Sequence, residues 1–390
     1  MLRAVVLLLP VFASAFPTVH NPPLWSSSTL GGMAFLHAGD SHGFNATQLD
    51  VVQKFAIVQF DKKANLAVLP GVSFEDRAIA LARTVKARAP RAKTLLYING
   101  MINFANSRLF NATAAATDPW LLAANLDTGA PLTISGNGVF NASAPPMRAL
   151  IVADARYGLA SGAFDGVFID RADWASSGKC AHYHGHFDAR TCRSLVPGQR
   201  QLFADLTAAL GAGAIVLAKE TGGAAALDWQ QANAAMTSDT FCSAYCHGCN
   251  ASADPAALWR AADAAHCAAS IGTIANMSAR GQLTESHAMG PLDGALGAAE
   301  REFTMAAFLV AAGNLSYFSY ADWAGACWEL AGTRWWPEYD RPLGAPLGPP
   351  ATPVSAGRPL VFARNFSSGT TVWVDVENHE AKITWAQAQR

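Results

Sequence analysis

The chain has 390 residues, of which 51% are hydrophobic and 15% charged, so it can bury a large core and is too long for one small domain. Its formal net charge is −1 and its pI is near 6.8, which gives no electrostatic reason to expect a nucleic acid or an anionic membrane as a partner. The 11 tryptophans offer flat apolar faces of the kind on which sugar rings stack, although many of them will be core residues. We therefore expect one main domain with a smaller appendage.

The first 15 residues are typical of a secretory signal peptide. Arg3 precedes an apolar run from Ala4 to Phe12, and the small residues at positions 13–15 provide a cleavage pattern. No later stretch reaches the roughly 18 apolar residues that a membrane helix needs. We expect a secreted, extracellular protein with no membrane partner after cleavage, and an uncleaved signal anchor is the alternative.

Two further features agree with the secretory pathway. Asn-x-Ser/Thr sequons, at which a secreted glycoprotein can be glycosylated, begin at Asn45, Asn111, Asn141, Asn250, Asn276, Asn314 and Asn365. The 7 cysteines predict disulfides and one odd thiol in an oxidising compartment. Cys180 and Cys192 bracket one loop and are the favoured pair. The connectivity among Cys242, Cys246, Cys249 and Cys267 stays open.

Short apolar strands alternate with amphipathic helices from residue 32 onward. The expected strands cover residues 32–37, 55–60, 94–98, 164–169, 214–218, 235–238, 271–275 and 315–320. The expected helices cover residues 45–52, 74–89, 147–161, 197–210, 227–233, 255–269 and 300–312, and Pro197 suits a first helical position. This alternation predicts an α/β fold, a (β/α)8 TIM barrel. A doubly wound open sheet is the alternative, but no glycine-rich phosphate turn follows the first strand.

Two long segments interrupt the alternation, and the tail differs in kind. Residues 103–147, which include Trp120, and residues 175–196 follow strand ends, where long excursions often serve substrate binding. After a Pro/Gly-rich linker, residues 360–366, 370–376 and 381–385 predict a small C-terminal antiparallel β appendage, which must pack against the barrel to be stable. The predicted organisation is a signal peptide at 1–15, a catalytic barrel at 16–341, and a linker with a small β domain at 342–390.

Carboxylates follow several of the predicted strands. The barrel rule places them together on the C-terminal rim, and they are Asp61, Asp170, Glu220, Asp239 and Asp322. Cleavage of a glycosidic bond needs one carboxylate to attack or stabilise the anomeric carbon and one carboxylic acid to protonate the leaving oxygen.

Asp170 ends the stretch Phe-Asp-Gly-Val-Phe-Ile-Asp and is the preferred nucleophile. A helix cap or an ion pair with Arg171 is the simpler reading of Asp170. Glu220 is one candidate acid, with Lys219 expected to point the other way along the strand. A helix cap or salt bridge is the simpler reading of Glu220.

Three segments carry a family resemblance: Phe164–Arg171, Pro337–Gly348 and Arg364–Val376. They resemble glycoside hydrolases of the α-galactosidase-like barrel superfamily. They are similar in particular to the hypothetical glycosyl hydrolase families allied to endo-α-1,4-polygalactosaminidase. The resemblance implies that Asp170 is the nucleophile and Asp239 the general acid. Relatives tend to carry Glu followed by an aromatic residue at the sixth strand, whereas this chain has Asp239-Thr-Phe.

The remaining candidate residues would bind substrate. They follow predicted strands, and they are Asp61, Asn99, Arg171, Asp173, Trp174, Asp322 and Trp323. The run Cys180-Ala-His-Tyr-His-Gly-His has enough nitrogen and sulfur for zinc, but a disulfide explains Cys180 better. We therefore expect no metal and no cofactor. No Gly-x-Ser-x-Gly elbow is present, which disfavours a serine hydrolase.

The sequence thus predicts a secreted, monomeric glycoside hydrolase acting on an α-linked oligo- or polysaccharide. A non-catalytic carbohydrate-binding barrel is the alternative from another class, and it is favoured if no second carboxylate lies within roughly 10 Å of Asp170. A metal-dependent hydrolase is a third possibility.

Overall fold

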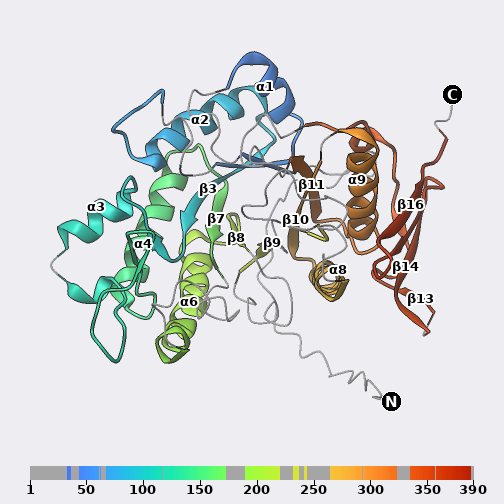
Figure 1. The fold of residues 1–390 in the computed structure, drawn as a ribbon. Coiled ribbons are helices and arrows are strands. Elements are labelled where there is room, and N and C mark those ends of the chain that lie inside the picture. The colour runs from blue at the N-terminus through green and yellow to red at the C-terminus, as the bar shows by residue number, and fades with distance from the viewer. Residues whose placement is uncertain are drawn as a thin grey trace.

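The computed structural model describes residues 33–36, 44–60, 62, 67–116, 118–172, 189–219, 232–236, 241–243, 264–291, 293–322, 334–355 and 357–387. Eight strands form one parallel sheet, and their order in the sheet equals their order in the chain (Figure 1). They are β1 (Met33–Leu36), β2 (Ile57–Phe60), β3 (Lys93–Asn99), β7 (Gly166–Asp170), β8 (Ile215–Ala218), β9 (Ala234–Met236), β10 (Leu283–Gly290) and β11 (Ser316–Asp322). The sheet is curled, and β1 lies near β11. No ladder of hydrogen bonds joins these two strands in the part of the chain that the structure describes.

Helices pack around the sheet, and β2, β3, β7, β8 and β10 are buried almost throughout, as is usual for a parallel sheet covered by helices. The described helices of this layer are α1 (Ala46–Val52), α2 (Phe74–Arg88), α4 (Pro145–Ala160), α6 (Ala189–Leu210), α8 (Ala264–Ala279) and α9 (Gly294–Leu309). Local signals fix several ends. Asn45 and Gln48 form a capping box at the start of α1. Ser73 caps α2, which has acidic residues in its first turn and basic residues in its last.

The prediction of a strand at residues 271–275 is wrong, because these residues lie inside α8. The buried residues Cys267, Ile271 and Ile274 recur at helical spacing, and this period outweighs the local β-branched composition. The strand at this point of the strand–helix alternation is instead β10. In it, Thr284, Glu285 and other buried polar residues replace the expected apolar run.

Helix α6 begins at Ala189 and contains Pro197, so the prediction that the helix starts at Pro197 is wrong. The turns before this proline are held by Cys192 and Leu195, which are buried in a second small hydrophobic cluster. A proline inside a helix removes one backbone hydrogen bond, and that packing compensates for the loss in the early turns. The expected helix at 227–233 and residues 255–263 lie outside the described residues, apart from positions 232 and 233.

The segment between β3 and α4, residues 100–144, is folded rather than irregular; we call it the β3–α4 insertion. It contains β4 (Ile102–Asn103), α3 (Arg108–Ala115), the 3-10 helix η1 (Pro119–Leu121), β5 (Thr133–Ile134) and β6 (Asn137–Val139). Its strands form a separate antiparallel sheet in the order β4-β6-β5. Ile102, Leu132 and Val139 pack with Leu195 of α6 in the second cluster. The insertion therefore has its own core and rests on α6.

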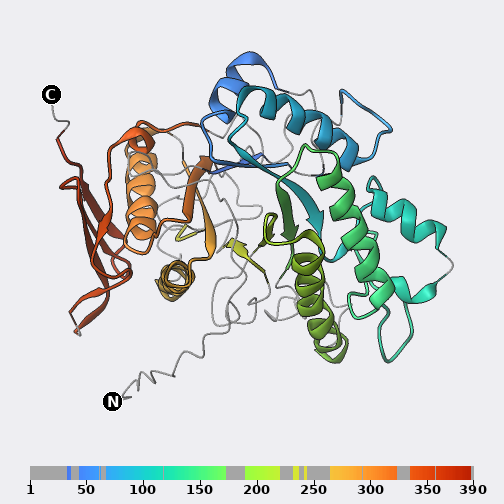
Figure 2. The ribbon, with the colours of Figure 1, turned by 180° about the vertical axis from the view of Figure 1, so that it is seen from behind.

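The predicted C-terminal antiparallel β appendage is confirmed. Its strands are β12 (Pro346–Leu347), β13 (Pro353–Ser355), β14 (Arg358–Phe366), β15 (Thr371–Asp375) and β16 (Glu380–Thr384). The sheet packs on α9 at one side of the molecule (Figure 2). Phe303 of α9 stacks on His379 at 3.7 Å, and Nε2 of His379 lies 2.8 Å from Glu300 Oε1. Buried Arg364 donates to the carbonyl of Ala312 just beyond α9.

Cys242 and Cys267 form a disulfide, one of the connectivities that the sequence left open. Cys192 is also disulfide-bonded, and because Cys180 lies outside the described residues the favoured pairing stays a prediction. The predicted signal peptide lies outside the described residues as well. Within the described chain, no helix combines the length and the apolar character needed to cross a membrane.

Candidate functional site

Asp170 is the last residue of β7 and lies opposite Asn99, the last residue of β3. Two glycines allow this close strand packing. A Cβ atom on Gly166 would lie 2.1 Å from the carbonyl oxygen of Ile215 on β8. A Cβ atom on Gly100 would lie 2.9 Å from Ile169 Cγ2, and the Gly100 amide donates to the Asp170 carbonyl at 2.9 Å. The carboxylate therefore stands on a tightly packed part of the sheet, at its C-terminal edge.

The Asp170 carboxylate is buried and accepts from four donors. Oδ2 accepts from the Tyr97 hydroxyl at 2.7 Å and from the Asn99 amide at 3.1 Å. Oδ1 accepts from the backbone N–H of Arg171 at 2.9 Å and lies 3.1 Å from Lys219 Nζ. A carboxylate has about four acceptor positions, so these donors use all of them.

The environment of Asp170 favours its charged form. Burial by itself would raise the pKa of this carboxyl group. The positive charge of Lys219 opposes this effect of burial by lowering the pKa. Arg171, the Tyr97 hydroxyl and Lys62 lower the pKa further. Together they hold the pKa of Asp170 well below its ordinary value. Asp170 is therefore ionised at neutral pH, as a nucleophile or an electrostatic stabiliser must be.

Tyr97 and Asn99 hold the carboxylate rigidly. The Tyr97 side chain is fully buried between Phe74 and Phe168. The Asn99 amide donates to the Tyr97 hydroxyl at 2.8 Å as well as to Asp170. The Asn99 side-chain oxygen accepts from the backbone N–H of Met101 at 3.0 Å and of Ile102 at 2.6 Å. Asn99 thus links the carboxylate to the start of the β3–α4 insertion.

Arg171 has a φ of 57°, a conformation that L-residues rarely adopt. Its carbonyl accepts from Gln199 of α6 at 3.4 Å. A strained residue next to a buried carboxylate is typical of functional sites, where the surrounding structure maintains it. Asp170 bonds the backbone of Arg171 and forms its ion pair with Lys219. The expectation that Lys219 and Glu220 point in opposite directions stays a prediction, because Glu220 lies outside the described residues.

Of the predicted site residues, the structure brings Asp170, Asn99 and Arg171 together. Asp322 ends β11, and its side chain is not among those described. The other predicted site residues lie outside the described residues and stay predictions: Asp61, Asp173, Trp174, Glu220, Asp239 and Trp323. The sequence analysis missed Tyr97 as a partner of Asp170. Its position two residues before Asn99 was the available signal, because alternate residues of a strand share a face.

A second buried carboxyl group, Glu285, lies on β10 and was also missed. Its Oε2 accepts from the amide of Gln59 on β2. Burial raises the pKa of Glu285 well above its ordinary value, and the Gln59 hydrogen bond only partly opposes this. Tyr317 is the β11 residue paired with Glu285, and burial together with the Glu285 charge raises the pKa of its hydroxyl. Among the described residues, no group of three His, Cys, Asp or Glu could hold a metal ion.

Comparisons with known proteins add a family. The sequence model of a family described as hypothetical glycosyl hydrolase family 15 matches residues 86–370. No curated protein matches the chain in sequence.

Three solved structures are among those to which the chain is similar. The glycoside hydrolase domain of PelA from Pseudomonas aeruginosa is 14% identical, with a TM-score of 0.46 over 74% of this chain and 94% of that one. Ega3 of Aspergillus fumigatus, in complex with galactosamine, is 14% identical, with a TM-score of 0.40 over 82% and 98%. The cyclic α-maltosyl-(1→6)-maltose hydrolase of Arthrobacter globiformis is 12% identical, with a TM-score of 0.45 over 95% and 96%.

Proposed function

The chain belongs to hypothetical glycosyl hydrolase family 15, whose sequence model matches residues 86–370, and we propose that it is a secreted enzyme that cleaves α-linked glycosidic bonds with Asp170 as nucleophile. Membership makes the chain a glycoside hydrolase, so its reaction is cleavage of a glycosidic bond. The α-linkage follows from the sequence resemblance to families allied to endo-α-1,4-polygalactosaminidase. The observation that carries the role of Asp170 is its carboxylate at a strand end, kept ionised by Lys219 and oriented by Tyr97 and Asn99.

A nucleophilic Asp170 implies a retaining reaction in two steps. In the first step, Asp170 bonds the anomeric carbon while a carboxylic acid protonates the departing glycosidic oxygen. In the second step, the same acid, now a base, takes a proton from water, which displaces Asp170 from the sugar. Asp239 and Glu220 are both candidates for this acid, and net retention of the anomeric configuration is the expected stereochemistry.

The four donors on Asp170 constrain how attack begins. Tyr97 and Asn99 are buried on β3, and the Arg171 donor is a backbone N–H, so none of these can leave without moving the sheet edge. Lys219 carries its ammonium group on a flexible four-carbon stem. We therefore propose that a substrate hydroxyl attracts the Lys219 ammonium group on binding, which frees a lone pair of Asp170 Oδ1 for attack.

The rest of the organisation is proposed on the same basis. The proximity of β1 and β11 supports closure of the sheet into a (β/α)8 barrel. The apolar N-terminal run and the sequons support secretion and glycosylation of the chain, which we expect to act as a monomer. The proposed domain organisation is a signal peptide at residues 1–15, a catalytic barrel at 16–341, and a linker with a small β domain at 342–390.

The Asp170→Asn variant tests the proposal. It keeps the size of the side chain and removes its charge, so hydrolysis of the substrate identified on a polysaccharide panel should fall at least about a thousandfold. Asp165→Asn is the matched control, because Asp165 directly precedes β7 and pairs with Lys86 and Lys93, at the opposite end of this strand from Asp170. Wild-type rates in folded Asp170→Asn protein, or equal losses in both variants, would refute the role of Asp170.

A further inference from the structure

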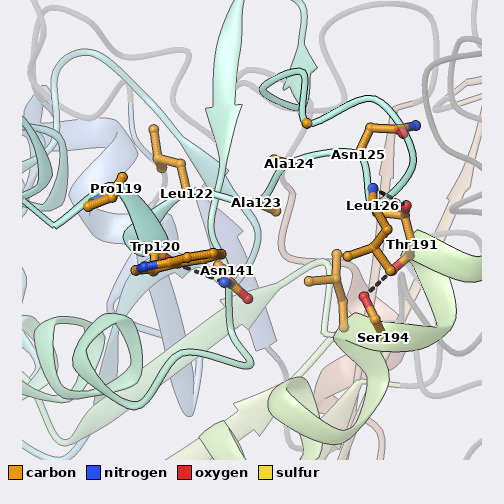
Figure 3. A pocket seen from close by; sticks show the side chains of 12 residues that line it. Pro119, Trp120, Leu122, Ala123, Ala124, Asn125, Leu126, Asn141, Thr191 and Ser194 are labelled. Atoms are coloured by element: carbon orange, nitrogen blue, oxygen red, sulfur yellow. Dashed lines mark hydrogen bonds between the residues drawn. The ribbon is translucent and has the colours of Figure 1, made fainter.

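A pocket lies on the surface of the β3–α4 insertion where the insertion meets the first turns of α6. Its volume is about 510 Å³. Trp120 of η1 lines it on one side, and Thr191 and Ser194 of α6 line it on another (Figure 3). Leu195 of α6 also lines the pocket. The Trp120 side chain is 72% exposed, which is unusual for the largest apolar residue type. An exposed indole at a pocket is a surface available for stacking.

The lining is held in place by its own hydrogen bonds. The Leu126 amide donates to the Thr191 hydroxyl at 3.1 Å, and the Ser194 hydroxyl donates to the Thr191 carbonyl at 2.7 Å. The Asn141 amide donates to the Trp120 carbonyl at 3.0 Å and accepts from the Ser143 amide at 3.2 Å. Trp120 is therefore presented on a fixed backbone, which reduces the entropy lost when a ligand binds.

The chemistry of the lining selects the class of ligand. All of the residues that line the pocket are uncharged, and most of the lining is apolar, with two asparagine amides and two hydroxyl groups among the lining side chains. Beside it, Asp127 and Arg190 pair with each other at 2.9 Å. An aromatic face with nearby amides matches an uncharged sugar ring, which offers C–H groups on one face and hydroxyls around its edge. A uronic acid would find no cation in this lining.

The pocket is connected to the site around Asp170 from two directions. Asn99 bonds both Asp170 and the backbone that begins the insertion. On the other side, Gln199 bonds the carbonyl of Arg171, and it lies four residues after the pocket residue Leu195 on α6, a helical rise of about 6 Å. The insertion that carries the pocket begins directly after β3, and Asp170 ends β7, the neighbouring strand of the sheet.

We propose that this pocket is an accessory subsite that binds an uncharged hexose or N-acetylhexosamine residue of the substrate chain, with Trp120 as the stacking platform. The inference rests on the proposed function, because that function identifies the ligand as part of the substrate. It implies that the enzyme holds an extended saccharide at a point away from the bond that Asp170 attacks. Binding through Trp120 then favours long chains over short ones.

One other saccharide could reach this pocket, namely a glycan attached to Asn141, which begins a sequon and lines the pocket. The Asn141 side chain donates one amide hydrogen to the Trp120 carbonyl and accepts from the Ser143 backbone N–H, so its second amide hydrogen is the position at which a glycan would be attached. The Ser143 hydroxyl of the same sequon donates to the Ser194 carbonyl at 2.8 Å. Peptide mass spectrometry of protein from a secretory host decides this point, and full occupancy of Asn141 would overturn the subsite.

Binding is tested by calorimetry in the Asp170→Asn protein, which separates recognition from hydrolysis. The probes are maltoheptaose, N-acetylchitohexaose and, as the charged probe, a galacturonic acid hexamer. At least one uncharged probe should bind, and Trp120→Ala should weaken that binding by about tenfold or more. Trp120→Phe should keep most of the affinity, and the galacturonic acid hexamer should not bind through Trp120.

Phe110→Ala is the matched control, because Phe110 is an exposed aromatic residue of α3 that does not line the pocket. It should leave the affinity unchanged. The proposal is overturned if no uncharged probe binds, or if Trp120→Ala and Phe110→Ala have the same effect. Hydrolysis by the wild-type chain is measured separately, so the catalytic role of Asp170 can fail while the Trp120 subsite holds, and the reverse.

Discussion

Glu75 provides a test of the electrostatics that does not depend on activity. It lies in the first turn of α2, fully buried, and its two oxygens lie 3.0 and 3.1 Å from the backbone N–H of Arg108. Burial, followed by the charge of Asp154 on α4, raises the pKa of Glu75 to about 8. Burial also raises the pKa of Asp154 to about 6. Glu75 therefore keeps its proton in the folded protein at neutral pH.

The sign of the effect on stability follows from linkage. The unfolded chain releases the Glu75 proton near its ordinary pKa, whereas the folded protein holds it up to a pH of about 8, so stability falls as pH rises between these values. One pKa unit corresponds to about 1.4 kcal/mol, so raising the pKa from 4.5 to about 8 weakens folding by up to about 5 kcal/mol across this window. Asp154 adds in the same direction, from 3.8 to about 6.

Glu75→Gln mimics the protonated carboxyl group, since an amide also accepts from Arg108 and donates toward Asp154. Urea unfolding should give similar stabilities for the variant and the wild type near pH 4.5, and the variant should be more stable by several kcal/mol near pH 8.5. Asp50→Asn, which removes an exposed ion pair with Arg88, serves as the control and should follow the wild-type pH dependence. Parallel pH profiles for Glu75→Gln and wild type would refute the buried-proton reasoning.

Two further predictions concern the site itself. Lys219→Met removes the largest favourable charge at Asp170, so the pKa of Asp170 should rise and the acid limb of the kcat/KM profile should move to higher pH. Lys219→Arg keeps the charge and should move the acid limb less. An unmoved limb in Lys219→Met would contradict the ion pair. Gly166→Ala places a Cβ against the Ile215 backbone and should destabilise the protein by more than about 3 kcal/mol in urea unfolding, whereas Gly213→Ala, with open space around its Cβ, should cost far less.

The sequence predicted a strand of this sheet correctly where the residues that are buried in the strand are also apolar. Residues 164–169 form an apolar run after a turn, and β7 begins and ends within two residues of that prediction. β10 could not be found this way, because Glu285, Ser286 and His287 are buried polar residues, and the partner of Glu285 is Gln59 on β2. Residues 271–275 were misplaced for the converse reason, since their β-branched side chains are buried on a helix.

The candidate site was predictable to the extent that it follows strand ends. Asp170 and Asn99 are both terminal strand residues, and the parallel register brings them together. The contribution of Lys219 could not be read from alternation, because β8 ends at Ala218 and the direction of the next side chain depends on the turn. The pocket at Trp120 could not be predicted either, because it forms where the insertion packs on the first turns of α6. In the sequence, Pro197 suggests that this helix begins only after those turns.

Asp170 and Glu285 show why burial alone does not identify a nucleophile. Both carboxyl groups are buried in one sheet, and burial raises the pKa of each. Asp170 is surrounded by cations and by rigid donors, which reverse the shift and keep it charged, whereas at Glu285 the Gln59 hydrogen bond does not offset burial. A charged carboxylate can attack an anomeric carbon, and a protonated one cannot. The donors on β3 and the cation after β8, more than depth in the sheet, therefore support the role proposed for Asp170 at the end of β7.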